Sequence, residues 1–207
     1  MKKAYFIDLD NTIYFTKPNV EVLLGPLYCL LENEDLGISE VDFEKAKEEM
    51  LRTPFQKVAT RYHFKEEVVA KAIDFLKERT LTIAMDVHDE YHYIKSLEGL
   101  KVIVTAGFTK TQTTKVQVLG IAHDFDELFV VDNTLTDGNK KDAFLILMKK
   151  YGLQPDDVLV VGDDPESEIK YGLDLGMTTF LYDPNGNFPN AETSYYGTTF
   201  KNISLIS

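Results

Sequence analysis

The stretch AYFIDLDNT at residues 4–12 decides the fold class, because it joins an uninterrupted apolar run to a pair of carboxylates. The apolar part is typical of a short buried strand in a parallel sheet. Asp8 and Asp10 follow at its end, where side chains two residues apart can point to the same side. One carboxylate of such a pair can attack a substrate while the other moves a proton. Acidic residues are common in loops, so a DxDxT match becomes informative only through its place directly after an apolar strand.

Downstream of residue 89 the sequence alternates between strand and helix patterns. Strands are expected at 101–105, 127–132, 158–161 and 178–182, with helices at 110–119, 141–151 and 166–175. This alternation predicts an α/β fold, a doubly wound parallel sheet with helices on both faces. The tail after Asp183 is rich in Asn, Gly, Pro and Thr and is expected to be irregular.

Between these two parts, residues 20–86 show only helical patterns. Four helices are expected, at about 20–31, 43–50, 54–62 and 66–81, with Ser39 as a cap and Pro54 in a first turn. The sequence therefore predicts two domains. An α/β core would comprise residues 1–15 and 86–207, and a small all-helical cap would be inserted at residues 16–85.

Two further strand ends carry polar groups, and ligands of open parallel sheets bind beyond such ends. Thr105-Ala106-Gly107 could hold phosphate oxygens, or Thr105 could simply cap the next helix. Asp163 and Asp164 follow a later strand as hard oxygen donors that suit Mg²⁺. The other interpretation is that these acids only favour the dipole at a helix N-terminus.

A lysine pair, Lys140-Lys141, opens the helix before those acids. Adjacent lysines are usually solvated. An acidic site that handles phosphate nevertheless needs a cation. The helix that begins with these lysines would start near the same sheet edge, so one of them could supply that charge.

The charge and residue composition restrict the kinds of partner and the location that can be expected. The formal net charge is −12, from 34 acidic and 22 basic residues, which disfavours nucleic acid and anionic membranes as partners. No apolar run approaches membrane-spanning length and no signal peptide can be read, so a cytoplasmic location is expected. Cys29 is the only cysteine, so no internal disulfide is expected, and it is predicted to be a buried structural thiol.

Together these motifs resemble, in number and order, the four motifs of the haloacid dehalogenase (HAD) superfamily, and the helical insert resembles the cap that many members carry. The motif residues are Asp8, Asp10 and Thr12, then Thr105, then Lys140 or Lys141, then Gly162 and Asp163 with Glu168. The resemblance implies a magnesium-dependent phosphatase acting on a small phosphorylated metabolite.

The resemblance also implies roles for individual residues. Asp8 would be the nucleophile and a metal ligand, Asp10 the acid and then the base, with its carbonyl on Mg²⁺, and Asp163 would complete the metal site. Thr105 and the lysine would hold the phosphoryl group. Further substrate contacts are expected from Thr12, Ala106, Gly107 and Lys141, and a further metal contact from Asp164.

Several points stay open at this stage. Lys140 is preferred over Lys141, and either Asp164 or Glu168 could supply the second acid of the last motif. The run 8–14 resembles the pyrimidine 5′-nucleotidase-like branch, so a nucleoside monophosphate and a sugar phosphate are both candidate substrates.

The cap also offers polar or aromatic side chains that could face the cleft: Arg52, Lys57, Arg61, Tyr62 and His63. At the junction of cap and core, Tyr14 and Phe15 could stack on a substrate.

Two alternatives to a phosphatase remain. A phosphomutase of the same superfamily would share the nucleophile and return the phosphoryl group to a sugar. A phosphoacceptor receiver domain would also combine acids, a threonine and a lysine on a doubly wound sheet, with Asp132 as the acceptor. The helical insert and the acids at 163 and 164 have no place in a receiver domain.

Overall fold

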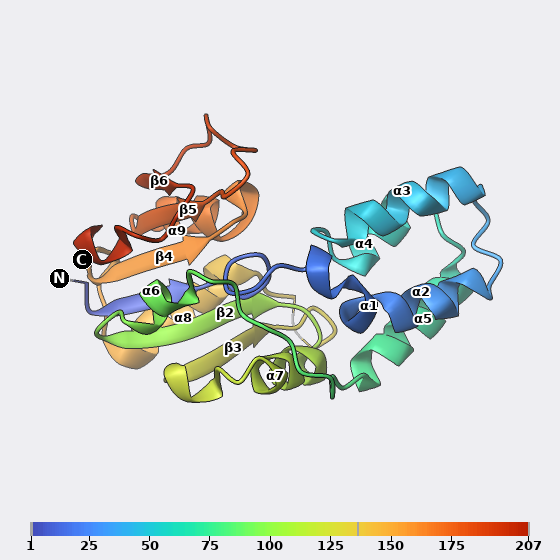
Figure 1. Cartoon of the computed structure of the whole chain (residues 1–207), viewed down its shortest axis with the longest axis horizontal. Coiled ribbons are helices and arrows are strands. Elements are labelled where there is room, and N and C mark those ends of the chain that lie inside the picture. Colours follow the sequence, from blue (N-terminus) through green and yellow to red (C-terminus); the bar gives the residue numbers. More distant parts are fainter. Residues whose placement is uncertain (1, 136, 207) are drawn as a thin grey trace.

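A single parallel sheet forms the core of the computed structural model, which describes residues 2–135 and 137–206 (Figure 1). Within these residues, the sheet has six strands in the order β3-β2-β1-β4-β5-β6. The strands are β1 (Ala4–Ile7), β2 (Leu100–Ala106), β3 (Glu127–Val131), β4 (Val158–Gly162), β5 (Thr178–Tyr182) and β6 (Tyr195–Gly197). The chain builds outward from β1 to β3 and then returns to β4 on the other side of β1. The order therefore reverses between β1 and β4, which is where ligands bind in such sheets.

Helices cover both faces of the sheet, as its alternating side chains require. Tyr5 and Ile7 pack on one face in the cluster that contains residues of α6 (Tyr91–Lys95) and α7 (Thr109–Val118). Ala4 and Phe6 point to the other face, against α8 (Lys140–Tyr151). All four β1 residues are buried. The predicted doubly wound α/β class is confirmed.

The helical segment lies beyond the carboxyl ends of the strands (Figure 1). Its helices, called the cap helices below, are α1 (Val20–Leu23), α2 (Gly25–Glu32), α3 (Glu40–Met50), α4 (Phe55–Arg61) and α5 (Glu66–Glu78). Most of them share one hydrophobic cluster, which includes Leu27, Phe43 and Leu76 and which Phe108 joins from the core. Leu81 and Met85 already pack with Tyr5 in the sheet core. Domain boundaries near residues 16 and 85 stay a prediction.

Capping explains several helix ends. The Ser39 hydroxyl accepts a hydrogen bond from the Asp42 N–H at 3.1 Å, and Pro54 precedes the first residue of α4. Gly152 ends α8 with a φ of 65°, a left-handed conformation that glycine adopts without steric cost. These are the ends that the sequence predicts.

Other local expectations were wrong. Cys29 is exposed, because it lies on the side of α2 opposite the buried Leu27 and Leu31. Tyr195–Gly197 pairs with β5 as a sixth strand, although the tail was expected to be irregular. The helix expected at 166–175 is broken: a π-helical turn (Pro165–Ile169) with non-helical backbone at Ser167 precedes α9 (Lys170–Asp174).

Candidate active site

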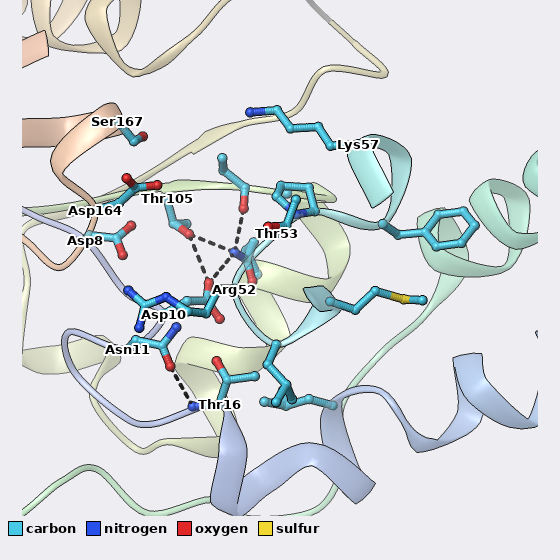
Figure 2. A pocket seen from close by; sticks show the side chains of 18 of the residues that line it. Asp8, Asp10, Asn11, Thr16, Arg52, Thr53, Lys57, Thr105, Asp164 and Ser167 are labelled. Atoms are coloured by element: carbon cyan, nitrogen blue, oxygen red, sulfur yellow. Dashed lines mark hydrogen bonds between the residues drawn. The ribbon is translucent and has the colours of Figure 1, made fainter. Parts of the chain in front are cut away.

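A cavity of about 660 Å³ lies between the cap helices and the carboxyl ends of β1, β2 and β4. Asp8, Asp10, Thr105, Lys140 and Asp163 line it from the core. In Figure 2, Asp8, Asp10 and Thr105 lie together on the core side, with Arg52 approaching from the cap. The sheet thus brings together residues that are up to 155 positions apart in the sequence, at the point where the strand order reverses.

Asp8 lies in a buried ion-pair network. Lys140 Nζ donates to Asp8 Oδ1 at 2.5 Å and to Glu168 Oε2 at 2.7 Å. Lys140 is the first residue of α8, and the Asn139 side chain fixes this helix start in a capping box. Lys141 points elsewhere and pairs with Asp174 at 2.9 Å. Lys140 rather than Lys141 therefore faces the cavity, and Lys141 is not among the residues that line it.

Three carboxylates crowd together beside this lysine. One oxygen each of Asp8, Asp163 and Glu168 can be chosen so that all lie within 4.8 Å of one another, and all three residues are buried. Burial raises the pKa of Asp8 against the opposing effect of Lys140, while burial, Glu168 and Asp8 together raise the pKa of Asp163. The crowding favours a cation between these groups.

Of the two residues left open for the second acid of the last motif, Glu168 lies in this cluster, whereas Asp164, which was also expected to contact the metal, does not. The Asp164 carboxylate instead accepts a hydrogen bond from the Glu166 N–H at 2.9 Å and so caps the π-helical turn. Both Glu168 oxygens are occupied, one by Lys140 and the other by the Asp164 N–H at 2.9 Å. Glu168 therefore orients the lysine and the loop, which leaves Asp8 and Asp163 as the carboxylates suited to a metal ion.

Gly162 makes this arrangement possible. A Cβ at this position would lie 2.1 Å from Glu168 Oε1, far inside van der Waals contact. Only glycine at the end of β4 lets the Glu168 side chain fold back under the loop.

Asp10 has a different set of neighbours. Lys115 Nζ donates to its Oδ1 at 2.7 Å, and the Tyr14 hydroxyl donates to the same oxygen. Gln112 Nε2 donates to Oδ2 at 3.1 Å, and the Thr105 hydroxyl lies 3.5 Å from that oxygen. Burial opposes the charge of Asp10, but Lys115 and the hydrogen bonds outweigh burial and lower its pKa.

Gln112 and Lys115 were missed by the sequence analysis. Both lie on the buried side of α7, on a face that continues with Val116 and Leu119. Positions 112, 115, 116 and 119 follow the spacing of an amphipathic helix face. Two polar residues at the start of that buried face, just after Thr105, were the available signal.

The remaining predicted substrate contacts divide into two groups. Ala106 and Gly107 line the cavity, and Gly107 has a φ of 146°, a conformation that favours glycine. Thr12 does not line it: the residue is fully buried, and its hydroxyl has no hydrogen-bond partner among the described residues.

The cap contributes one direct contact to the acidic cluster. Arg52, in the loop between α3 and α4, donates to Asp163 Oδ2 at 2.5 Å, and its guanidinium carbon lies 5.6 Å from the centre of the Phe188 ring. Lys57 also lines the cavity. Of the other cap candidates, Arg61 pairs with Glu49, and neither Tyr62 nor His63 lines the cavity.

Tyr14 and Phe15, at the junction of cap and core, have structural partners. Tyr14 is fully buried against Asp10, and Phe15 stacks on His88 with ring centres 5.2 Å apart. Neither lines the cavity, and a stacking role on a substrate stays a prediction that this geometry does not favour.

The observed sheet order excludes the receiver alternative, whose fold has the order 2-1-3-4-5. Asp132, which a receiver domain would need as its phosphoacceptor, is instead held by Thr109 and Thr134 through hydrogen bonds of 2.7 to 3.0 Å.

Among the described residues, none of the helices is both long and apolar enough to cross a bilayer.

Two curated relatives match most of the chain. A glyceraldehyde 3-phosphate phosphatase of Methanocaldococcus jannaschii is 27% identical, covering 86% of this chain and 84% of the relative. A human N-acylneuraminate-9-phosphatase is 26% identical, covering 90% of this chain and 85% of the relative.

Solved structures show the same fold. An HAD phosphatase from Thermococcus onnurineus superposes with a TM-score of 0.67 at 20% identity, covering 100% of this chain and 97% of that one. An HAD-hydrolase of Bacillus subtilis, determined with bound magnesium, gives 0.68 at 19% identity, with coverage of 99% and 98%.

A family model for haloacid dehalogenase-like hydrolases matches residues 2–176, which span the helical insert and the ends of β1, β2 and β4 that line the cavity. Motif order, sheet topology and this match agree, so the resemblance seen in the sequence is confirmed: the chain belongs to the haloacid dehalogenase-like hydrolases.

Proposed function

We propose that the protein is a Mg²⁺-dependent phosphatase that hydrolyses a small phosphorylated metabolite through an aspartyl-phosphate on Asp8. The observation that carries this proposal is the buried contact of Asp8 with Lys140, next to Asp163, at the base of the cavity. Family membership and the two relatives named as phosphatases support the same reaction class.

Asp8 and Asp163 would hold the metal ion, together with the backbone carbonyl of Asp10. The donor set fits Mg²⁺, which takes oxygen ligands and commonly only one or two protein carboxylates. Crowded carboxylates that gain from a cation are the structural feature that supports this fit. When bound, Mg²⁺ supplies positive charge that offsets the repulsion between Asp8 and a phosphate dianion.

In the first step, an Asp8 oxygen attacks phosphorus and the bond to the leaving alcohol breaks. At 4 Å and an effective dielectric constant of 20, each pair of like unit charges opposes this approach by about 4 kcal/mol. Lys140 provides one compensating charge at 2.5 Å from Asp8. Lys140 and Thr105 hold the phosphoryl oxygens while negative charge develops on them.

In the second step, water hydrolyses the aspartyl-phosphate and Asp10 takes its proton. The lowered pKa of Asp10 keeps its carboxylate ionised and able to accept a proton. For the first step, Asp10 therefore has to take up a proton from solvent when the substrate binds. It gives this proton to the alkoxide leaving group and regains one from water in the second step. Aryl phosphates need little such help because phenolates are weaker bases than alkoxides.

The cap helices close the cavity opposite Asp8 and can exclude water during the reaction.

The names of the relatives give glyceraldehyde 3-phosphate and N-acylneuraminate 9-phosphate as their substrates, which favours a phosphorylated carbohydrate over a nucleoside monophosphate for this protein. A cytoplasmic location stays a prediction.

Release of inorganic phosphate from p-nitrophenyl phosphate tests the proposal. Activity should require Mg²⁺, disappear with a chelator and return when Mg²⁺ is restored. Full activity after exhaustive chelation would contradict the metal requirement. Incubation with a hexose 1-phosphate, followed by product analysis, separates a phosphatase from a phosphomutase, because only the mutase returns the phosphoryl group to the sugar.

A further inference from the structure

Two cationic side chains that line the cavity come from the region of α3 and α4 in the cap. Arg52 lies just after α3, and Lys57 lies near the start of α4. In Figure 2, the Lys57 side chain extends from α4 in the direction of the core, where Asp164 and Ser167 lie. Both cations therefore face the region that the leaving group of a phosphomonoester bound at Asp8 would occupy.

The other cations that line the cavity already have partners within the protein. Lys140 is held by Asp8 and Glu168, and Lys115 is held by Asp10. The Arg79 guanidinium donates to the carbonyl oxygens of Val22 and Leu23, so it ties the end of α5 to α1. These three side chains serve the phosphoryl site or the fold.

Lys57 differs from all of them because it forms no ion pair with any residue in the ranges 2–135 and 137–206. Two acids of the cap also line the cavity. Glu49 is paired with Arg61, and Glu48 also borders a separate groove that contains Lys47. The positive charge of Lys57 is thus available to a ligand.

Arg52 has Asp163 as its partner, which is a metal ligand under the proposed function. A carboxylate that binds a cation has less negative charge to offer a guanidinium. Arg52 would then be free to turn toward a bound ligand beside Lys57.

We propose that Lys57, assisted by Arg52, binds a second anionic group on the substrate, a carboxylate or a second phosphate carried by the leaving group. The proposal rests on the proposed function and names its substrate class. The apolar wall formed by Leu24, Leu27 and Phe108 accommodates the carbon skeleton between the two charged ends. A neutral polyol phosphate would leave Lys57 without a partner.

Matched pairs of substrates test this inference. 3-Phosphoglycerate and glycerol 3-phosphate differ by a carboxylate in place of a hydroxymethyl group, and fructose 1,6-bisphosphate adds a second phosphate to fructose 6-phosphate. We expect kcat/KM to be about tenfold or more higher for the anionic member of at least one pair, mainly through KM. A preference for the anionic member of the first pair would identify the second anionic group as a carboxylate. A preference seen in the second pair alone would identify it as a phosphate.

Variants attribute the preference to the lysine. Lys57→Met should reduce the ratio of the two kcat/KM values to near one, whereas Lys57→Arg should keep it. Lys77→Met is the matched control, because Lys77 is also a lysine of a cap helix but does not line the cavity. Its ratio should equal that of the wild type.

Binding to the Asp8→Asn protein, measured by calorimetry with Mg²⁺ present, separates this inference from the proposed reaction. Tighter binding of the anionic member, lost in Asp8→Asn/Lys57→Met, supports the second anion site even if no ester is hydrolysed. Equal kcat/KM values within both pairs, or a preference that survives Lys57→Met, would overturn it.

Discussion

Asp8 and Asp10 leave the same strand two residues apart, yet their surroundings are opposite. Asp8 lies with two other carboxylates and one lysine, and burial raises its pKa. Asp10 is partly exposed, and a lysine, a tyrosine and a glutamine donate to it, so that its pKa is lowered. The Asp8 carboxylate thus has too little positive charge around it, whereas the Asp10 carboxylate has hydrogen-bond donors on both oxygens.

The difference shows that the neighbours, rather than the residue type, distinguish the two roles proposed for these aspartates. A carboxylate that still lacks positive charge is suited to share a metal ion and to receive a phosphoryl group. A carboxylate saturated with donors stays ionised and is suited to take a proton from water. The substitutions below are designed to break or sharpen this contrast.

The largest effect is expected at the nucleophile itself. Asp8→Asn should lower phosphatase activity at least about a thousandfold, because the amide cannot form the covalent intermediate. Asp10→Asn should also be slow, but its acid-quenched protein should carry one phosphoryl group in intact-mass measurements. A phosphorylated Asp8→Asn protein would contradict the assignment of the nucleophile.

The second largest effect on activity is expected from the lysine beside Asp8. Lys140→Met should reduce kcat by roughly a hundred- to a thousandfold, as expected when a preorganised charge at the reacting group is lost. Lys141→Met provides the control, because that neighbour pairs with Asp174 outside the cavity. Steady-state kinetics that show equal losses in both variants would remove the distinction between the two lysines.

The lysine beside Asp10 should have a smaller effect and a different signature. Lys115→Met should slow turnover by about ten- to a hundredfold, because Asp10 loses the cation that keeps it ionised, and hydrolysis of the intermediate suffers most. Rapid-quench mass measurements should therefore find more phosphorylated protein at steady state than in the wild type.

Lys110→Met is the matched control for that experiment, since Lys110 lies on the same helix and pairs with Glu78 on the surface. Lys115→Arg should recover part of the rate, because the charge is kept. A Lys115→Met protein that turns over slowly without accumulating the intermediate would place the role of Lys115 in the first step instead.

Much of the fold could be predicted because its signals are local. Apolar runs give the buried strands, and Ser39, Pro54 and Gly152 define helix ends through backbone chemistry. The sixth strand could not be predicted, since Tyr195–Gly197 is short and its two tyrosines are exposed. Its pairing comes from the neighbouring β5, which is not visible in the sequence of the tail.

The candidate site was predictable where a residue lies at the carboxyl end of a strand or opens a helix. Asp8, Thr105 and Asp163 lie at strand ends, where they converge as parallel strands require, and Lys140 begins α8. The choice of Glu168 over Asp164 depends on the broken helix at Ser167 and on the space above Gly162, and neither is apparent from residue spacing. Arg52 reaches Asp163 across 111 positions, a contact set by how the cap folds over the core.

Gln112 should have the smallest effect of these side chains, because it contributes hydrogen bonds without charge. Its Nε2 lies 3.1 Å from Asp10 Oδ2, 2.7 Å from Thr105 Oγ1 and 2.9 Å from the Ala106 carbonyl oxygen. A neutral hydrogen bond contributes roughly 1 kcal/mol, so Gln112→Leu should slow turnover by about fivefold. Gln117→Leu, on the exposed side of the same helix, should match the wild type in both kcat and thermal unfolding. If Gln112→Leu were as slow as Lys115→Met while remaining folded, the geometry of the donors would matter more than the charge of the lysine, and the electrostatic contrast between Asp8 and Asp10 would no longer explain their roles.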